Sequence, residues 1–227
     1  HTGKCAGQSI QEGMARILRS HAVIFEYHVF DANKRLLEAL EYLEGKKTAQ
    51  FSIVIATREP LRRWASSFNW DLHNLFLSHN RKHPRDFEKY SNVNQLVSGI
   101  MRKESQAVKF GKFGHMGMGI SWYLPTDKHF LLKPENTYVL RTESLDADFR
   151  SFIGHFFGKH SLFMNGLATE DLNLSRTKHD FHLSYPVGTF QDLDYSNQVA
   201  LDAMKSYLDD DITSHSRLVS SFVRQRA

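Results

Sequence analysis

IVIATREPLRRWASSF, residues 53–68, joins a short apolar run to an amphipathic helix through a polar corner. The β-branched run 53–55 predicts a strand that is buried on both faces of a parallel sheet. Pro60 stands at the first helical position, where its missing N–H costs nothing. Apolar side chains then recur at the spacing of one helix face: Leu61, Trp64, Ala65 and Phe68. The stretch therefore predicts a strand that feeds a helix through a tight corner.

This corner is a candidate anion site. The carboxyl end of a strand and the N-terminus of a helix bring free N–H groups and a positive dipole end together. Arg58 lies at the corner, and Ser66 follows two turns along the helix. We expect a phosphate to bind there. The alternative is that Arg58 pairs with Glu59 or with another surface carboxylate.

Composition and charge indicate one globular domain, residues 1–227, that can bury a sizeable core. The 29 Lys and Arg exceed the 25 Asp and Glu, so the formal charge of +4 favours anionic ligands without requiring nucleic acid. No apolar run reaches the roughly eighteen residues of a membrane span, and no signal-peptide pattern opens the chain. The single cysteine, Cys5, excludes an intrachain disulfide and a cysteine-based zinc motif. We expect a cytoplasmic protein, or one of the Golgi lumen if an N-terminal anchor has been removed.

The opening HTGKCAGQSI, residues 1–10, predicts a phosphate-binding loop that leads into a helix ending near Ser20. Lys4 adds a positive charge between small residues whose backbone amides can close on a ligand. Because Lys4 precedes Cys5 and not a Ser or Thr, the magnesium ligand of nucleotide kinases is missing, which counts against phosphoryl transfer. A phosphate loop normally follows a buried strand, so we infer that a strand before residue 1 is missing from this sequence. The helix should bury one side: Ile10, Met14, Ile17 and Leu18.

The segment from His21 to Asp31 predicts a second buried strand over residues 22–25 with ionisable residues at its far end. Period-two alternation puts Glu26 and His28 on the same side. A carboxylate beside an imidazole can orient it and make it a base near neutral pH. The alternative is a polar strand end in which Asp31 caps the next helix. That helix carries a core stripe: Ala32, Leu36, Leu37, Leu40 and Leu43.

In this order, the three stretches resemble the sulfotransferases that use 3′-phosphoadenosine 5′-phosphosulfate (PAPS). Residues 1–10 look like the 5′-phosphosulfate loop of that family, His-x-Pro-Lys-Thr-Gly-Gly-Thr-Ser. The loop matches at Lys4, Gly7 and Ser9, and it departs at Gly3, Cys5, Ala6 and Gln8. Residues 57–68 look like the 3′-phosphate motif: Arg58, Pro60, Arg63 and Ser66 match, and Glu59 replaces Asp. EYHVFD, residues 26–31, is similar to a segment of heparan-type 3-O-sulfotransferases, and its His-Val resembles the catalytic histidine segment of 2-O-sulfotransferases.

The resemblance implies an α/β fold, a P-loop-like three-layer domain with a central parallel sheet flanked by helices. It implies PAPS as the donor, PAP as the product, no metal, and a hydroxyl acceptor, either a glycan or a small molecule. By resemblance, Lys4 is catalytic, Glu26 or His28 is the base and Asp31 assists. Donor-binding residues are Lys4, Cys5, Ala6, Gly7, Gln8 and Ser9 at the 5′ end, Arg58 and Ser66 at the 3′-phosphate, and Arg176 in a late basic loop.

Sulfuryl transfer does not require the magnesium-binding Ser or Thr that is missing after Lys4. A sulfuryl group carries less negative charge than a phosphoryl group, so Lys4 and loop amides suffice to stabilise it. Two alternatives remain: a P-loop phosphotransferase that consumes magnesium ATP, and a nucleotide-binding module without turnover. Consumption of ATP that depends on magnesium would support the first alternative. The second predicts that the donor binds without turnover and that replacing His28 and Glu26 has no effect.

The remaining chain is read mainly as structure. Residues 70–94 predict a helix and a polar loop, which is either a solvated face or the groove for an acidic acceptor. The glycines of 113–124 allow a sugar site or a lid, but Trp122 and Tyr123 favour core. A strand is predicted at 137–141 and a core-facing helix at 149–157. Residues 195–222 predict one or two helices that break near residues 209–211 and pack through Val199, Ala203, Tyr207 and Leu208.

Overall fold

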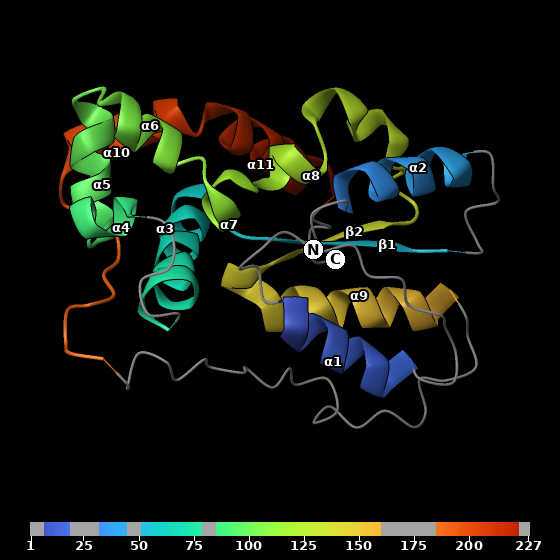
Figure 1. The fold of residues 1–227 in the computed structure, drawn as a ribbon. Helices are drawn as coiled ribbons and strands as arrows, with labels where there is room; N and C mark the ends of the chain where they lie inside the picture. Colours follow the sequence, from blue (N-terminus) through green and yellow to red (C-terminus); the bar gives the residue numbers. More distant parts are fainter. Residues whose placement is uncertain (1–6, 19–31, 45–50, 79–84, 160–184, 223–227) are drawn as a thin grey trace.

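A small parallel sheet lies at the centre of the protein (Figure 1). The computed structural model describes residues 7–18, 32–44, 51–78, 85–159 and 185–222. Strand β1 (Ile53–Thr57) pairs with β2 (Thr137–Arg141) in parallel, with Ile53 opposite Thr137 and Thr57 opposite Arg141. The two predicted strands are thus confirmed. Most of the other described residues are helical, and the protein has a general α/β fold.

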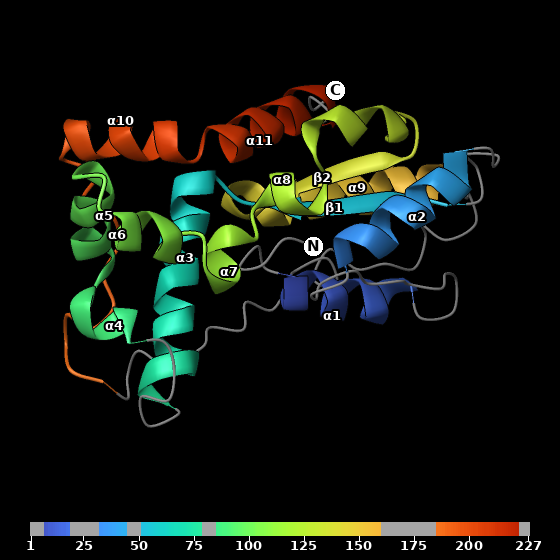
Figure 2. The same ribbon diagram turned by 45° about the horizontal axis from the view of Figure 1, so that its top comes forward.

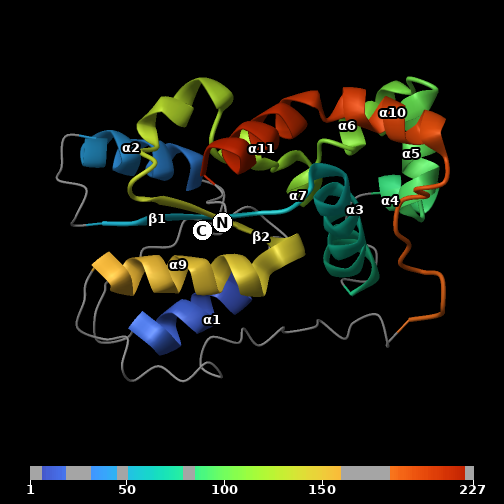
Figure 3. The ribbon, with the colours of Figure 1, turned by 180° about the vertical axis from the view of Figure 1, so that it is seen from behind.

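Helices cover both faces of this sheet, because its side chains alternate between two cores. Helices α1 (Gly7–Leu18) and α9 (Leu145–Lys159) pack on one face, and α2 (Ala32–Glu44), α8 (Ile120–Tyr123) and α11 (Asp209–Phe222) pack on the other (Figures 1 and 3). The first face carries Val54, Ala56, Tyr138 and Leu140, and the second carries Ile53, Ile55 and Val139. In β1, full burial is found only in the last two residues, so the prediction of a strand buried throughout is wrong for residues 53–55.

A third core lies at one end of the sheet around α3 (Pro60–Asp71), which continues as the π-helix η2 (Leu72–Leu77). The predicted helix face is confirmed, since its four apolar residues are at most 6% exposed. Around α3 lie α4 (Asp86–Lys89), α5 (Val93–Met101), α6 (Ser105–Phe110), α7 (Gly114–Gly117) and α10 (Gln198–Tyr207). Figure 2 shows α10 and α11 following one another along one side of the molecule.

The predictions for residues 113–124 and 195–222 are confirmed for the elements, but the predicted buried face of α10 (Gln198–Tyr207) is partly wrong. The glycine-rich stretch forms α7 and α8, where Tyr123 is buried as predicted. The chain breaks at Leu208 between α10 and α11, as expected, but Val199 is 69% exposed. On this side Ala200, Met204 and Leu208 are buried, and of these only Leu208 was predicted, while Tyr207 of the predicted stripe is half-buried against the same core.

The first two helices also match expectation. In α1, Ile10 and Ile17 are buried, and in α2, Leu40 is buried while Leu36 and Leu37 pack against the same core. The 3-10 helix η3 (Thr126–Leu131) precedes β2, and the 3-10 helix η4 (Thr142–Ser144) follows it. Among the helices within the described ranges, none combines the length and the apolarity needed to cross a bilayer.

Candidate functional site

The carboxyl ends of β1 and β2 form one edge at which both strands turn into helices. Thr142 Oγ1 donates a hydrogen bond to the Thr57 carbonyl at 2.9 Å, and the Glu59 N–H donates to Glu143 Oε1 at 2.9 Å. These two bonds hold the β1–α3 corner against the β2–α9 corner. In open α/β sheets, ligands bind beyond this edge.

The N-terminus of α3 is capped by the chain itself. The Glu59 carboxylate accepts the N–H groups of Leu61 at 3.1 Å and Arg62 at 2.8 Å, and the Arg63 N–H bonds to the Glu59 carbonyl. Pro60 has no N–H to offer. The prediction of free N–H groups for an anion at this corner is therefore wrong, because a carboxylate at the N-cap already satisfies them and opposes the dipole.

Arg58 and Ser66 remain available at this corner. Both side chains are half-buried, and neither makes a hydrogen bond or an ion pair with any residue that the structure describes. The alternative in which Arg58 pairs with Glu59 is not observed, since the Glu59 carboxylate binds the helix start. Ser66 lies one turn beyond Arg62 on the same side of α3.

Residues 185–197, here called the return segment, run along α3 from its far end to its start. His73 contacts Tyr185 at 5.6 Å between ring centroids, and Asn69 donates a hydrogen bond to the Gln191 carbonyl at 2.9 Å. At the other end, the Arg62 guanidinium lies 5.8 Å from the centre of the Tyr195 ring.

Tyr195 is thereby brought next to the corner. Burial raises the pKa of the Tyr195 phenol, the Glu59 charge adds to this, and the Arg62 and Arg58 charges oppose it. The phenol is thus protonated at neutral pH. Sequence reasoning missed Tyr195, and no local pattern distinguishes it from other tyrosines of the chain.

His215 of α11 also lies near this edge. Burial lowers the pKa of its imidazole, while the Glu143 and Glu59 carboxylates partly oppose that shift. Its Nε2 atom is buried and has no hydrogen-bond partner within the described ranges. The charges of two carboxylates at the edge of the sheet therefore act on a half-buried imidazole, which the sequence did not indicate.

Arg141, at the end of β2, is committed to a structural ion pair. Its Nε and Nη2 atoms donate to the two oxygens of Asp148 at 2.9 Å, and Ser144 Oγ donates to the same carboxylate at 3.0 Å. Burial acts to raise the pKa of Asp148, but the hydrogen bonds from Arg141 and Ser144 outweigh it and lower that pKa. Arg58 is therefore a better candidate than Arg141 for binding an anion.

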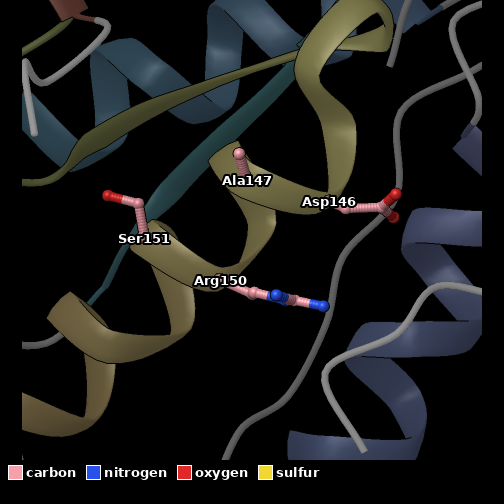
Figure 4. Close-up of a pocket in the computed structure, with 4 residues that line it drawn as sticks. All are labelled: Asp146, Ala147, Arg150 and Ser151. Atoms are coloured by element: carbon pink, nitrogen blue, oxygen red, sulfur yellow. The ribbon is translucent and has the colours of Figure 1, made fainter. Parts of the chain in front are cut away.

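A shallow cavity of about 540 Å³ lies on α9, close to the same edge (Figure 4). Its described lining consists of Asp146, Ala147, Arg150 and Ser151, from the first half of that helix. Figure 4 shows the side chains of Asp146 and Arg150 extending toward the α1 side of α9. A carboxylate, a guanidinium and a hydroxyl suit a polar ligand, and sequence reasoning did not find this group.

Most of the other predicted site residues lie outside the described residues: Lys4, Cys5, Ala6, Glu26, His28, Asp31 and Arg176. Gly7 and Gln8 are the first residues of α1, and Ser9 is 7% exposed within that helix. The strand predicted at 22–25 and the turn after α2 also lie outside.

Among the described side chains, no group of three His, Cys, Asp or Glu gathers as metal ligands would. The groups at the edge that suit an anionic cofactor are Arg58, Ser66 and Arg62. Searches of protein-family models, curated proteins and solved structures found none that matches this chain.

Proposed function

We propose that this protein is a sulfotransferase that moves the sulfuryl group of PAPS to a hydroxyl, most suitably that of a carbohydrate. The observation that carries the proposal is the β1–α3 corner. It presents Arg58 and Ser66 at the spacing of a 3′-phosphate motif, both half-buried and without a partner among the described residues. The proposed fold is a P-loop-like three-layer domain, which is supported by the helices on both faces of β1 and β2.

In this proposal, side chains do most of the work of binding the 3′-phosphate. Because Glu59 occupies the N–H groups at the start of α3, a phosphate depends on the Arg58 guanidinium and the Ser66 hydroxyl. A charge-assisted bond from an arginine is about twice as strong as a neutral one and favours planar, two-point recognition of phosphate. A donor without a 3′-phosphate leaves Arg58 without its ligand.

The remaining roles rest on the sequence motifs. The acceptor oxygen bonds to sulfur as the bond from sulfur to the bridging oxygen breaks, and PAP departs with the electron pair. Lys4 stabilises the charge on that oxygen, Glu26 or His28 receives the hydroxyl proton, Asp31 assists and Arg176 contacts the nucleotide. No metal enters this scheme.

Calorimetric titration with PAP and with ATP tests the proposal. We expect wild-type protein to bind PAP more tightly than ATP, because only PAP offers a 3′-phosphate. Arg58→Ala should weaken PAP binding by about 10- to 100-fold, as the loss of a hydrogen bond to a charged group implies. The matched control is Lys109→Ala, which removes an exposed cation on α6 and should leave the affinity unchanged.

Other outcomes identify the alternatives. Equal affinity for PAP and ATP, or an Arg58→Ala variant that binds PAP normally, contradicts the proposed 3′-phosphate site. Consumption of magnesium ATP identifies a phosphotransferase. Tight binding of PAP without release of sulfate to water or transfer of the sulfuryl group from PAPS to a carbohydrate acceptor identifies a nucleotide-binding module that lacks turnover.

A further inference from the structure

His115 and Asp71 form a buried hydrogen-bonded pair between α7 and α3. The Asp71 side chain is 0% exposed, and its Oδ1 atom lies 2.5 Å from His115 Nδ1. Its other oxygen accepts the backbone N–H of His115 at 2.9 Å. The His115 side chain itself is 36% exposed. A fully buried carboxylate thus orients an imidazole that solvent can reach.

Only one polar atom of His115 is left without a partner among the described residues. The backbone N–H and Nδ1 bind Asp71, and the carbonyl accepts a hydrogen bond from Arg63 Nη1 at 2.8 Å. Because Nδ1 donates its proton to the carboxylate, the neutral ring carries its lone pair on Nε2. Nε2 is therefore the atom at which His115 can accept a proton from another molecule.

The surrounding backbone is shaped around this pair. Gly114 has a φ of +52°, and a Cβ atom at that position would lie 2.6 Å from Asp71 Oδ2. Only glycine accommodates both the backbone angle and the carboxylate. The π-helix η2 begins at Leu72, directly after Asp71, and such segments are frequent at functional sites. Two independent features thus converge on the same carboxylate.

Ser66 and Asp71 belong to the same helix, and five residues advance an α-helix by about 7.5 Å along its axis. A nucleotide is longer than this advance. A donor bound at Ser66 and Arg58 meets the pair only if it runs along α3 toward α7, and a role for His115 in the reaction requires that direction.

We propose that His115 is an acid–base residue of this protein and that its Nε2 receives the proton of the acceptor hydroxyl. The inference rests on the proposed sulfotransferase function and adds a candidate base to Glu26 and His28. In this step, the hydroxyl oxygen bonds to sulfur, the bond from sulfur to the bridging oxygen breaks, and PAP leaves with the electron pair. The imidazolium then returns the proton to solvent. Asp71 is a positioning residue that fixes the tautomer and stabilises the imidazolium.

Substitution by asparagine separates this role from a purely structural one. In His115→Asn, the amide nitrogen replaces Nδ1 as the donor to Asp71, whereas Nε2 is lost. The readout is the loss of labelled sulfuryl groups from PAPS, measured as free sulfate with water as acceptor and as labelled oligosaccharide with a heparan oligosaccharide as acceptor. We expect the rate to fall by about 10²- to 10⁴-fold, as for the loss of a general base. PAP affinity and the urea midpoint of unfolding should stay unchanged.

Two further variants test the chemistry independently. His115→Ala should regain part of its rate when imidazole is added to the solution, which a merely structural contact would not show. Asp71→Asn should lower kcat and leave the KM for PAPS unchanged, because the amide does not hold the ring in the Nδ1–H tautomer as the carboxylate does. A rate for His115→Asn within threefold of wild type, or no rescue of His115→Ala by imidazole, overturns the inference.

Failure of the inference and failure of the proposed function give different results. If wild type binds PAP through Arg58 and releases sulfate, but His115→Asn does so equally well, the function stands and the role of His115 is refuted. If wild type neither prefers PAP to ATP nor transfers the sulfuryl group to water or to the oligosaccharide, the function fails and the role of His115 fails with it.

Discussion

Arg62 and Arg63 are neighbours in the sequence but occupy opposite environments. Arg63 is 2% exposed and donates to the carbonyls of His115 at 2.8 Å and Met116 at 3.0 Å. It also pairs with Asp211 of α11 at 3.3 Å. The Arg62 side chain is exposed, and its guanidinium lies over the Tyr195 ring. Arg63 therefore joins α3, α7 and α11, whereas the Arg62 side chain lies at the surface.

Replacing each arginine should separate these roles by stability. Arg63→Met removes the cation that balances the buried Asp211 charge and a donor to several backbone carbonyls, so the free energy of unfolding should fall by about 3–5 kcal/mol. Arg62→Ala loses one exposed cation–π contact, and the fall should stay below about 1 kcal/mol. Urea denaturation followed by circular dichroism measures both. Similar losses in the two variants would show that the buried network does not stabilise the fold.

The strand and the helix around Arg58 and Ser66 were predicted correctly, because they follow from apolar spacing within one short stretch. The role of Arg58 and Ser66 in binding a phosphate stays a prediction. Arg63 was named only as a motif match, because its partner Asp211 lies 148 positions away. Tyr195 was missed for the same reason, since it reaches the corner through the course of the return segment. Local secondary-structure propensities do not predict contacts between residues so far apart in the sequence.

At the scale of whole elements, two glycines differ in the space that their surroundings leave for a side chain. Gly154 lies inside α9, and a Cβ atom there would meet nothing within 4 Å. Gly119 precedes α8, and a Cβ atom there would overlap the Asp211 carboxylate. That carboxylate accepts hydrogen bonds from the Ser121 N–H at 3.0 Å, from Ser121 Oγ and from Arg63.

Alanine should therefore have opposite effects at these two positions. Gly154→Ala removes the conformational freedom of a helical glycine in the unfolded chain, and it should raise the free energy of unfolding by about 0.5–1 kcal/mol. Gly119→Ala displaces the Asp211 carboxylate from its donors, and it should lower that free energy by about 3 kcal/mol. Thermal and urea unfolding report both values. A destabilised Gly154→Ala would mean that α9 has less space than the structure shows.

The register of α10 shows why an element can be predicted while its buried face is not. This helix has two apolar stripes, one through Val199, Ala203 and Tyr207 and the other through Ala200, Met204 and Leu208. Both have the spacing of a helix face, so periodicity alone does not separate them. Packing against α5 decides, and it buries Met204 while Val199 stays 69% exposed. The choice is made by the tertiary structure.

At the scale of the whole molecule, α11 connects the sheet to the helical end. It packs on β2, η3 and α8, and it reaches α3 through the pair formed by Asp211 and Arg63. Two half-buried histidines lie along it. His129 of η3 contacts Ser214 Oγ at 3.1 Å, and His215 belongs to α11 itself. Burial lowers the pKa of both imidazoles.

These two histidines should make the protein less stable in mild acid. Because their pKa values lie below the ordinary value of about 6.5 when folded, the unfolded chain takes up protons first as the pH falls. Their contribution is therefore complete above about pH 7 and is lost as the pH falls toward their folded pKa values. Nearby charges modulate this, since Asp127 opposes and Arg217 favours the neutral form of His129, while Glu143 opposes that of His215.

Urea midpoints measured between about pH 7.5 and 5.5 test this prediction, in a range that stays above the ordinary carboxyl pKa values. Wild type should lose stability continuously across that range. The double variant His129→Gln, His215→Gln should lose less, because two groups that bind protons preferentially in the unfolded chain are gone, and glutamine at 129 retains a donor for Ser214. The matched control is Lys205→Ala, which removes an exposed ion pair with Asp202 and should keep the full wild-type pH dependence. If the double variant and wild type lose equal stability, the acid sensitivity arises from residues other than His129 and His215. Protonation of histidines along α11 would then not be its cause.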